Sequence, residues 1–322
     1  MKFYFFILLS IISAGLSAQF APPALQLGTT AIHKDSAIFI YWASGAKVNA
    51  GYQNIANTSL GKANVGDSSM ALGKAGENGI ASLGDGGEAI LTFEYAIRNG
   101  NGFDFAVFEN SFSDDFLELA FVEVSSDGVN FFRFPATSNT DTTTQTGSFG
   151  ATDATKINNL AGKYRALYGT PFDLEELKNE IGLDVNNITH VKIVDVVGSM
   201  QNQYASRDQY GHKINDPWPT AFGSSGFDLD GVGVINSLGN DISELATTVF
   251  RVYPNPIDNG AVLNFQNAKG NITIVDVQGA IVYASPVNEN NYTLVLSFLN
   301  SGIFFVYLND GNNIHTQKIV VR

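Results

Sequence analysis

Short stretches of alternating apolar and polar residues recur along the larger, N-terminal part of the chain, separated by clusters of Gly, Asn, Asp and Ser. Alternation with a period of two places successive side chains on opposite faces of a strand. The clearest stretches cover residues 89–95, 103–109, 117–125, 191–197 and 227–235. Many short strands joined by turns predict an all-β fold, with a jelly-roll-like β-sandwich over residues 19–236.

Two segments of this domain depart from the alternating pattern. Asp173 with Glu176 forms a capping-box sequence, and Gly182 stands where a helix would end. The apolar positions between them fall on one helical face: Leu174, Leu177 and Ile181. We therefore expect one short helix over residues 174–181. Residues 137–159 are rich in Thr, Asn, Ser and Gly and predict an exposed loop.

The C-terminal residues show a second, shorter series of strands. Pro254 and Pro256 cannot donate to a ladder, so a turn is expected over residues 253–259. Strands are predicted over residues 261–265, 272–277, 292–296, 303–308 and 314–321. They indicate a small Ig-like β-sandwich over residues 249–322, which the polar residues 237–248 would link to the larger domain.

The N-terminus has the pattern of a cleavable signal peptide. Lys2 precedes an apolar run over residues 3–12, and small residues follow over 13–18. We expect cleavage after Ala18. The alternative is a membrane anchor, but no later segment is apolar over the ~18 residues that a spanning helix needs. The mature chain is therefore expected to have no transmembrane segment.

The C-terminal motifs identify an export signal. Their order along the chain is Tyr253-Pro254-Asn255-Pro256, then Asp276-Val277-Gln278-Gly279, then Gly302-Ile303-Phe304-Phe305-Val306, then Lys318 to Arg322. This order resembles the type A C-terminal sorting domain of the type IX secretion system of Bacteroidetes-type bacteria. The resemblance implies passage through the periplasm and recognition of residues 249–322 by the translocon and the sortase. It also implies a secreted or outer-membrane cell-surface location, with the tail removed when the cargo is anchored.

The larger domain resembles a family of uncharacterised bacterial cell-surface proteins. The motifs that carry this likeness are Phe-Asp-Phe-Ala-Val-Phe-Glu-Asn at residues 103–110 and Gly-Phe-Asp-Leu-Asp-Gly-Val-Gly-Val at residues 226–234. The likeness implies an extracytoplasmic role. It brings no catalytic residues with it.

Composition and charge narrow the classes of partner. The chain has 18 Lys and Arg against 31 Asp and Glu, a net charge of -13, so it has no basic stripe for a nucleic acid backbone. Its 322 residues include no cysteine, which excludes disulfides and attachment of lipid through a cysteine. Stability must come from the core and, on one hypothesis, from bound metal ions.

Carboxylates in strands suggest a structural calcium site. Ca²⁺ takes about six to eight oxygen ligands, and it suits an acidic extracellular protein. Asp195 lies in an apolar strand context, where an unpaired carboxylate is costly, and Asp228 and Asp230 share one strand face. The candidate ligands are Asp104, Glu109, Asp195, Asp228 and Asp230. The alternative is that these groups accept backbone hydrogen bonds at strand ends and bind no metal.

Aromatic residues suggest a carbohydrate-binding surface. Residues 201–226 are polar and contain Gly211, Pro217 and Pro219, which predicts a long loop. On a loop, the spacing of four between Asp208, His212 and Asp216 does not indicate a zinc site. The candidate ligand-binding residues are Trp42, Tyr204, Tyr210 and Trp218. The tryptophans fit a second interpretation equally well, as packing anchors.

These observations favour a secreted or cell-surface binding protein with a carbohydrate ligand. One alternative is an extracellular polysaccharide hydrolase that uses two carboxylates, such as Glu118 with Glu123 or Glu109 with Asp104. Another alternative is a nutrient-capture protein that works with an outer-membrane transporter. The sequence contains no Gly-x-Ser-x-Gly, His-Glu-x-x-His or P-loop motif.

Overall fold

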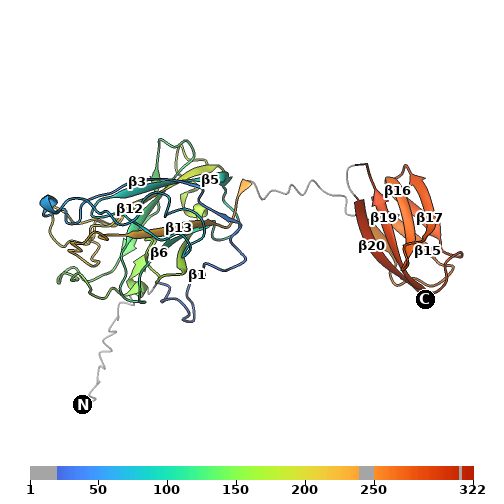
Figure 1. The fold of residues 1–322 in the computed structure, drawn as a ribbon, viewed down its shortest axis with the longest axis horizontal. Helices are drawn as coiled ribbons and strands as arrows, with labels where there is room; N and C mark the ends of the chain where they lie inside the picture. The colour runs from blue at the N-terminus through green and yellow to red at the C-terminus, as the bar shows by residue number, and fades with distance from the viewer. Residues whose placement is uncertain (1–19, 239–249, 312–313) are drawn as a thin grey trace, which may run out of the picture. The chain divides into compact units, whose positions relative to one another are not determined.

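The computed structural model describes residues 20–238, 250–311 and 314–322, which belong to two compact units, Met1–Asp241 and Ile242–Arg322 (Figure 1). The predicted signal peptide, with its cleavage site after Ala18, lies outside the described residues, as does most of the predicted linker 237–248. In the described parts of the chain, no helix is both long and apolar enough to cross a membrane.

The first unit consists of two antiparallel sheets, which confirms the all-β prediction. One sheet has the order β1 (Ile32–His33), β11 (Tyr168–Phe172), β6 (Phe105–Glu109), β13 (Asp228–Val234) and β2 (Tyr41–Trp42), and β4 (Ala81–Ser82) also pairs with β13. The other has the order β3 (Gly45–Asn49), β5 (Glu88–Ile97), β12 (Ile188–Asp195), β7 (Ala120–Ser125) and β8 (Phe132–Arg133). Figure 1 shows β3, β5 and β12 in a layer above β6 and β13.

The main core lies between these two sheets. Phe105 and Val107 of β6 belong to the same buried cluster as Leu91 of β5, Val122 of β7 and Val191 of β12. Each strand thus directs alternate apolar side chains toward the other sheet, as its sequence pattern predicts. Burial of one such side chain contributes about 1.5–3 kcal/mol. No disulfide is available, so this contact between the sheets holds the unit together.

Short elements complete the first unit. They are η1 (Thr58–Leu60), η2 (Ala154–Lys156), η3 (Leu174–Leu177) and a two-stranded sheet of β9 (Thr137–Ser138) and β10 (Ile157–Asn158). Of these, η2, β9 and β10 lie in the segment 137–159 that the sequence predicted as a loop, and η3 lies in the predicted helix.

The predicted helix over 174–181 is wrong beyond Leu177. The structure has only the 3₁₀ turn η3, begun by Asp173, whose carboxylate accepts a hydrogen bond from the backbone N–H of Glu175. Leu174 and Leu177 are buried, whereas Ile181 is 96% exposed. The side chain of Glu176 accepts a hydrogen bond from Asn159. Two buried leucines anchor a single turn, and a short helix without further burial is marginal.

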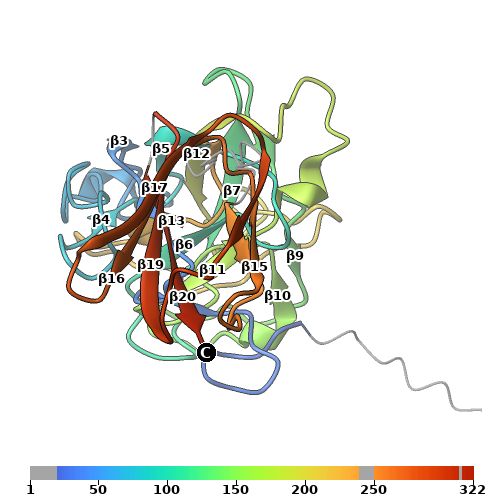
Figure 2. The same ribbon diagram turned by 90° about the vertical axis from the view of Figure 1, so that its right-hand side faces the viewer.

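The second unit has a three-stranded and a four-stranded antiparallel sheet (Figures 1 and 2). The first is β14 (Arg251–Tyr253), β15 (Val262–Gln266) and β18 (Asn291–Val295); the second is β17 (Ile281–Val287), β16 (Gly270–Asp276), β19 (Gly302–Asn309) and β20 (Ile314–Val321). The five predicted strands are present within two residues at each end. The sequence missed β14 and β17. Pro286 weakened the pattern of β17, and the structure places that strand at a sheet edge, where proline is tolerated.

Candidate functional site

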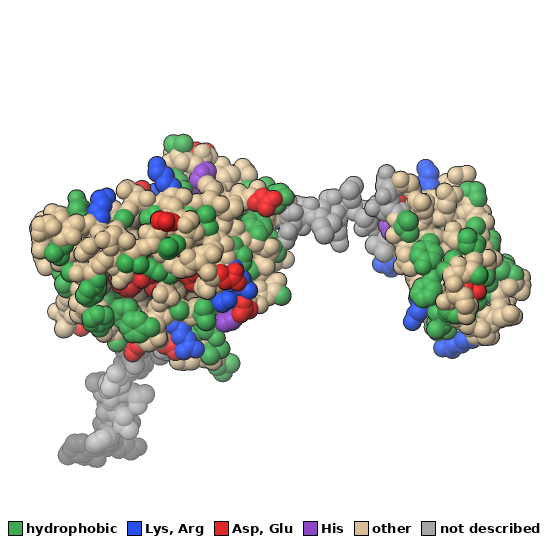
Figure 3. Space-filling view, in the orientation of Figure 1, with side chains coloured by type: hydrophobic (Ala, Val, Ile, Leu, Met, Phe, Trp, Pro, Cys, Tyr) green, Lys and Arg blue, Asp and Glu red, His purple; other side chains and the backbone are tan. Residues whose placement is uncertain are grey.

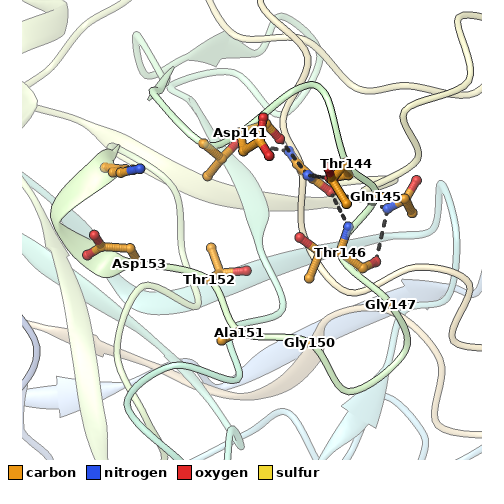
Figure 4. A pocket seen from close by; sticks show the side chains of 12 residues that line it. Asp141, Thr144, Gln145, Thr146, Gly147, Gly150, Ala151, Thr152 and Asp153 are labelled. Atoms are coloured by element: carbon orange, nitrogen blue, oxygen red, sulfur yellow. Dashed lines mark hydrogen bonds between the residues drawn. The ribbon is translucent and has the colours of Figure 1, made fainter.

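Residues that the sequence predicted as an exposed loop enclose a hollow of about 400 Å³ in the first unit (Figure 4). Most of the residues that line it have polar side chains, with hydroxyl, amide, carboxylate and ammonium groups, although carbon atoms form about half of the lining surface. The polar groups come chiefly from Asp141, Thr144, Gln145, Asp153, Lys156 and Asn215. Figure 4 shows the segment from Asp141 to Thr146 on one side and Thr152 with Asp153 on the other. We call this site the polar hollow.

Asn215 holds one wall of the polar hollow in place. It is 2% exposed, and its Nδ2 donates to the carbonyl oxygens of Asp141 (2.5 Å) and Thr144 (2.6 Å). Its Oδ1 accepts from the backbone N–H of Thr146 (2.9 Å) and from Nε2 of Gln145 (3.2 Å). Both donors and the acceptor of one buried amide are used, so the wall is fixed before any ligand arrives.

Four phenylalanine rings form a row beside the polar hollow. The ring centroids are 4.4 Å apart for Phe112 and Phe116, 6.1 Å for Phe116 and Phe149, and 5.6 Å for Phe149 and Phe222, with interplanar angles of 17°, 27° and 25°. Phe112 and Phe149 are each 72% exposed. Phe149 lies between Gly147 and Gly150, both of which line the hollow. We call these residues the phenylalanine row; sequence reasoning missed it because loop aromatics follow no periodic pattern.

The aromatic residues that the sequence singled out do not form one surface. Trp218 is 6% exposed, and its Nε1 donates to Oδ2 of Asp85 (3.0 Å). Tyr204 is half-buried, with its ring 6.4 Å from that of Trp218. The ring of Trp42 packs 5.2 Å from Phe39 and 5.0 Å from Phe108. Tyr210 is 67% exposed. Within the described residues, no ring contact joins Trp42 to the other three.

Carboxylates gather at one end of the sandwich interior. By strand alternation, Glu109 at the end of β6 faces the same side as the core residues Phe105 and Val107. Asp195 at the end of β12 likewise faces the same side as the core residues Val191 and Ile193.

Glu118, just before β7 of the second sheet, also faces the sandwich interior, because it is an even number of residues from the core residues Ala120 and Val122. It is 8% exposed, and no hydrogen bond to its carboxylate occurs in the described part of the chain. Sequence reasoning considered Glu118 only as half of an acid–base pair. Together with Asp228, whose carboxylate bonds to the hydroxyl of Ser82, these residues are the interior carboxylates: Glu109, Glu118, Asp195 and Asp228.

Burial raises the pKa of every interior carboxylate. It raises the pKa of Asp195 to about 8, with the nearby Asp85 adding to the effect, although N–H groups of Phe227 and Gly86 partly oppose it. Burial raises the pKa of Asp228 to about 6. Burial, followed by mutual repulsion with neighbouring carboxylates, raises the pKa of Glu109 and of Glu118 well above the usual range.

Three of the five predicted calcium ligands lie among these groups, and two lie elsewhere. The carboxylate of Asp104 accepts hydrogen bonds from the N–H groups of Gly100 and Leu174 and from Asn236. The carboxylate of Asp230 accepts from the N–H of Gly76 (2.8 Å). Across residues 20–238, 250–311 and 314–322, no three Asp, Glu or His side chains are grouped closely enough to hold a metal ion.

The carboxylate pairs considered for hydrolysis are not brought together. Glu123 forms ion pairs with Arg133 (2.7 Å) and Lys192 (2.6 Å), and it lies on the strand face opposite Glu118. Asp104 and Glu109 stand at opposite ends of β6. Glu109 and Glu118 do approach each other, but they are 1% and 8% exposed, so a polysaccharide has no access to them.

Comparison with known families identifies the second unit. Residues 251–322 match the family described as the secretion system C-terminal sorting domain, which confirms the predicted type IX sorting tail. The tail indicates that the chain is exported by the type IX secretion system and is secreted or displayed at the cell surface. No curated protein matches the chain.

Two solved structures are similar to parts of this chain, but neither similarity is strong enough to show a shared fold. PorZ, an essential surface component of the type IX secretion system of Porphyromonas gingivalis, is 17% identical with a TM-score of 0.22, over 29% of this chain and 14% of PorZ. A β-glucuronidase of Ruminococcus gnavus is 10% identical with a TM-score of 0.21, over 88% of this chain and 44% of the enzyme. The chain therefore spans less than half the length of each, and the TM-scores are too low to show a shared fold.

Deletion of residues 249–322 is expected to block export, because it removes the sorting domain that the translocon recognises. The truncated protein should accumulate in the periplasm, as measured by immunoblotting of periplasmic, outer-membrane and medium fractions. As a second variant, the full-length chain would carry Ile274→Asp, which places a charge at a buried position of the tail and should disrupt its fold. Normal secretion of the truncated chain would contradict the assignment.

The raised pKa values of the interior carboxylates predict that the stability of the metal-free protein falls as pH rises. A carboxyl whose pKa is raised in the fold binds a proton more tightly there than in the unfolded chain, so its stabilisation is complete below the ordinary value near 3.8 and lost by about pH 8. For Asp195 the slope is up to about 1.4 kcal/mol per pH unit. Asp195→Asn should flatten the dependence measured by urea unfolding in a chelator, whereas the exposed Glu94→Gln should not. Identical slopes in wild type and Asp195→Asn would refute the assignment.

Proposed function

We propose that the first unit is a carbohydrate-binding module that the sorting tail delivers to the cell exterior. The observation that carries this proposal is the phenylalanine row beside the polar hollow. A sugar ring has an apolar face, which stacks on an exposed aromatic ring, and a rim of hydroxyl groups, which need hydrogen-bond partners. Phe149 offers the first kind of surface, and Asp141, Gln145 and Asp153 offer the second, on the same loop.

The rigidity of the loop supports binding rather than a purely structural role. Asn215 fixes the wall from Asp141 to Thr146, and Ser148 Oγ donates to the carbonyl of Pro219 (2.7 Å) next to Phe149. A preformed site loses little conformational entropy when it binds. In addition, the buried hydroxyl of Thr152, which lines the hollow, has no hydrogen-bond partner in the described part of the chain.

The volume of the polar hollow suits a ligand of one or two sugar units, since sites for small ligands measure about 300–1,000 Å³. Capture of a small nutrient for an outer-membrane transporter would use the same hollow. The two roles differ in the length of the ligand, because the phenylalanine row continues past the hollow from Phe149 to Phe112. A row of stacked rings favours an extended chain of sugars.

Phe149→Ala is expected to weaken glycan binding by about tenfold or more, because it removes an exposed ring whose contact with the sugar contributes roughly 1.4 kcal/mol or more of binding free energy. The full chain would first be tested on a glycan array, and the affinity for the best ligand would then be measured by calorimetry. Phe103→Ala, at a partly exposed ring outside the row, should leave affinity unchanged. Equal losses in both variants, or no loss in Phe149→Ala, would remove the phenylalanine row from the binding site.

The calcium hypothesis narrows to the interior carboxylates. Glu118 favours it, because its carboxylate is buried and accepts no hydrogen bond in the described part of the chain. No three carboxylate or histidine side chains there are close enough to share one ion, so backbone carbonyl and water oxygens would have to complete the coordination. Calcium bound only to the folded state would raise the melting temperature of the full chain by several degrees at saturation. Glu118→Gln should lose most of this rise, and Glu94→Gln should keep it. A melting temperature that is the same in calcium and in chelator would exclude the site.

A further inference from the structure

A second hollow, of about 460 Å³, adjoins the polar hollow and has a different charge. The two share Thr140, and the two cationic residues of the second, Arg207 and Lys213, come from one hairpin, which also contributes His212 to the lining. In this hairpin the backbone of Arg207 bridges that of Lys213. The remaining lining is polar and includes Ser138, Asn139 and Thr142. We call it the cationic hollow.

Cations gathered in one hollow are unusual in this chain, whose net charge is -13. Figure 3 shows Lys and Arg side chains only in small separate groups on the face of the first unit that is in view. Several other cations of that unit already have carboxylate partners, among them Lys74, Arg133, Arg165, Lys178 and Lys192. The cationic hollow is therefore a local exception to the charge of the chain.

The two strong cations of the hollow have no carboxylate partner among the described residues. The guanidinium of Arg207 donates to the carbonyl of Gly211 (2.7 Å) and to Oδ1 of Asn202 (3.4 Å). The ammonium of Lys213 donates to the carbonyl of Met200 (2.5 Å). These neutral acceptors orient both side chains and leave their positive charges uncompensated.

Asp208, the carboxylate nearest in sequence, is engaged in building the hairpin. It is 6% exposed, and its Oδ1 accepts from the backbone N–H groups of Tyr210 and His212, both at 2.9 Å. Its Oδ2 accepts from the N–H of Ser138 (3.1 Å) and lies 3.5 Å from Nδ1 of His212. The carboxylate of Asp208 thus lies behind the surface, whereas Arg207 and His212 are exposed.

We propose that the cationic hollow binds an acidic substituent, a carboxylate or a sulfate, of the glycan whose neighbouring unit occupies the polar hollow. This inference rests on the proposed function and names its ligand class, an acidic polysaccharide. Guanidinium groups bind carboxylate and sulfate oxygens through paired N–H donors. In the polar hollow, Asp141 and Asp153 outnumber Lys156, so an acidic group is repelled there and directed toward Arg207 and Lys213.

The test measures binding to the full chain by calorimetry. Polygalacturonate and its methyl ester have the same sugar backbone and differ in charge, and chondroitin sulfate is a second acidic polymer with a different backbone. Polygalacturonate or chondroitin sulfate should bind more tightly than the methyl ester, and the difference should shrink in high salt. The double variant Arg207→Gln/Lys213→Gln should lose at least about tenfold in affinity for the acidic polymer and leave binding of the methyl ester unchanged.

Controls separate local from general charge effects. Lys62→Gln/Lys178→Gln makes the same change in net charge, and Lys62, like Lys213, donates to a backbone carbonyl. It should bind like wild type, and Arg207→Lys, which keeps the charge, should lose less than the double variant. Equal loss in the two double variants would overturn the inference. Melting temperatures establish that each variant is folded.

The outcomes also separate this inference from the proposed function. Tight binding of the methyl ester that Phe149→Ala abolishes, without any preference for an acidic polymer, would overturn the acidic subsite and leave the binding face intact. An acidic preference lost in Arg207→Gln/Lys213→Gln but insensitive to Phe149→Ala would support the subsite and refute the phenylalanine row. Failure to bind all three polymers counts against both.

Discussion

Contact between the apolar faces of two antiparallel sheets is the interaction on which the first unit depends. The chain has no cysteine, so no covalent link limits the unfolded ensemble. The rings and branched side chains of β5, β6, β7 and β12 meet in one buried cluster instead. Three of the interior carboxylates, Glu109, Glu118 and Asp195, lie at the end of this cluster, where strand alternation continues inward beyond the apolar residues. The free energy cost of burying these carboxylates falls when they are protonated or accept backbone N–H groups such as that of Phe227. On our hypothesis, bound calcium lowers this cost further.

The sandwich also determines where ligands can bind. Long segments without regular strands connect β9 to η2 and β12 to β13. Loops of this length usually expose backbone groups to water. Here the buried amide of Asn215 satisfies the carbonyl oxygens of Asp141 and Thr144, which converts a Thr-rich and Gly-rich loop into a wall with a defined shape. A rigid scaffold that carries such a loop is well suited to hold both hollows.

The sequence predicted what depends on local pattern. Alternation located the main strands, and the ordered motifs of the last residues identified the sorting tail. The helix was predicted too long, because the buried environment of Leu174 and Leu177 does not extend to Ile181. The groups of residues that the structure brings together were largely not predicted, because their members come from distant segments. Glu118 meets Glu109 only when the two sheets pack together, and Phe149 joins Phe116 and Phe222 only when three loops converge.

Charge distribution gives these sites different roles. An acidic chain repels polyanions over its whole surface, so an acidic glycan can bind only where local cations outweigh that field. Arg207 and Lys213 meet this requirement because Asp208, the carboxylate nearest to them in sequence, is turned inward to fix the hairpin that presents them. Binding of a nucleic acid backbone would involve many phosphates and would require a continuous basic surface, which this composition does not predict. On our proposal, the cationic hollow, together with the adjoining polar hollow and its phenylalanine row, selects a ligand that alternates apolar faces with single negative charges, as an acidic polysaccharide does.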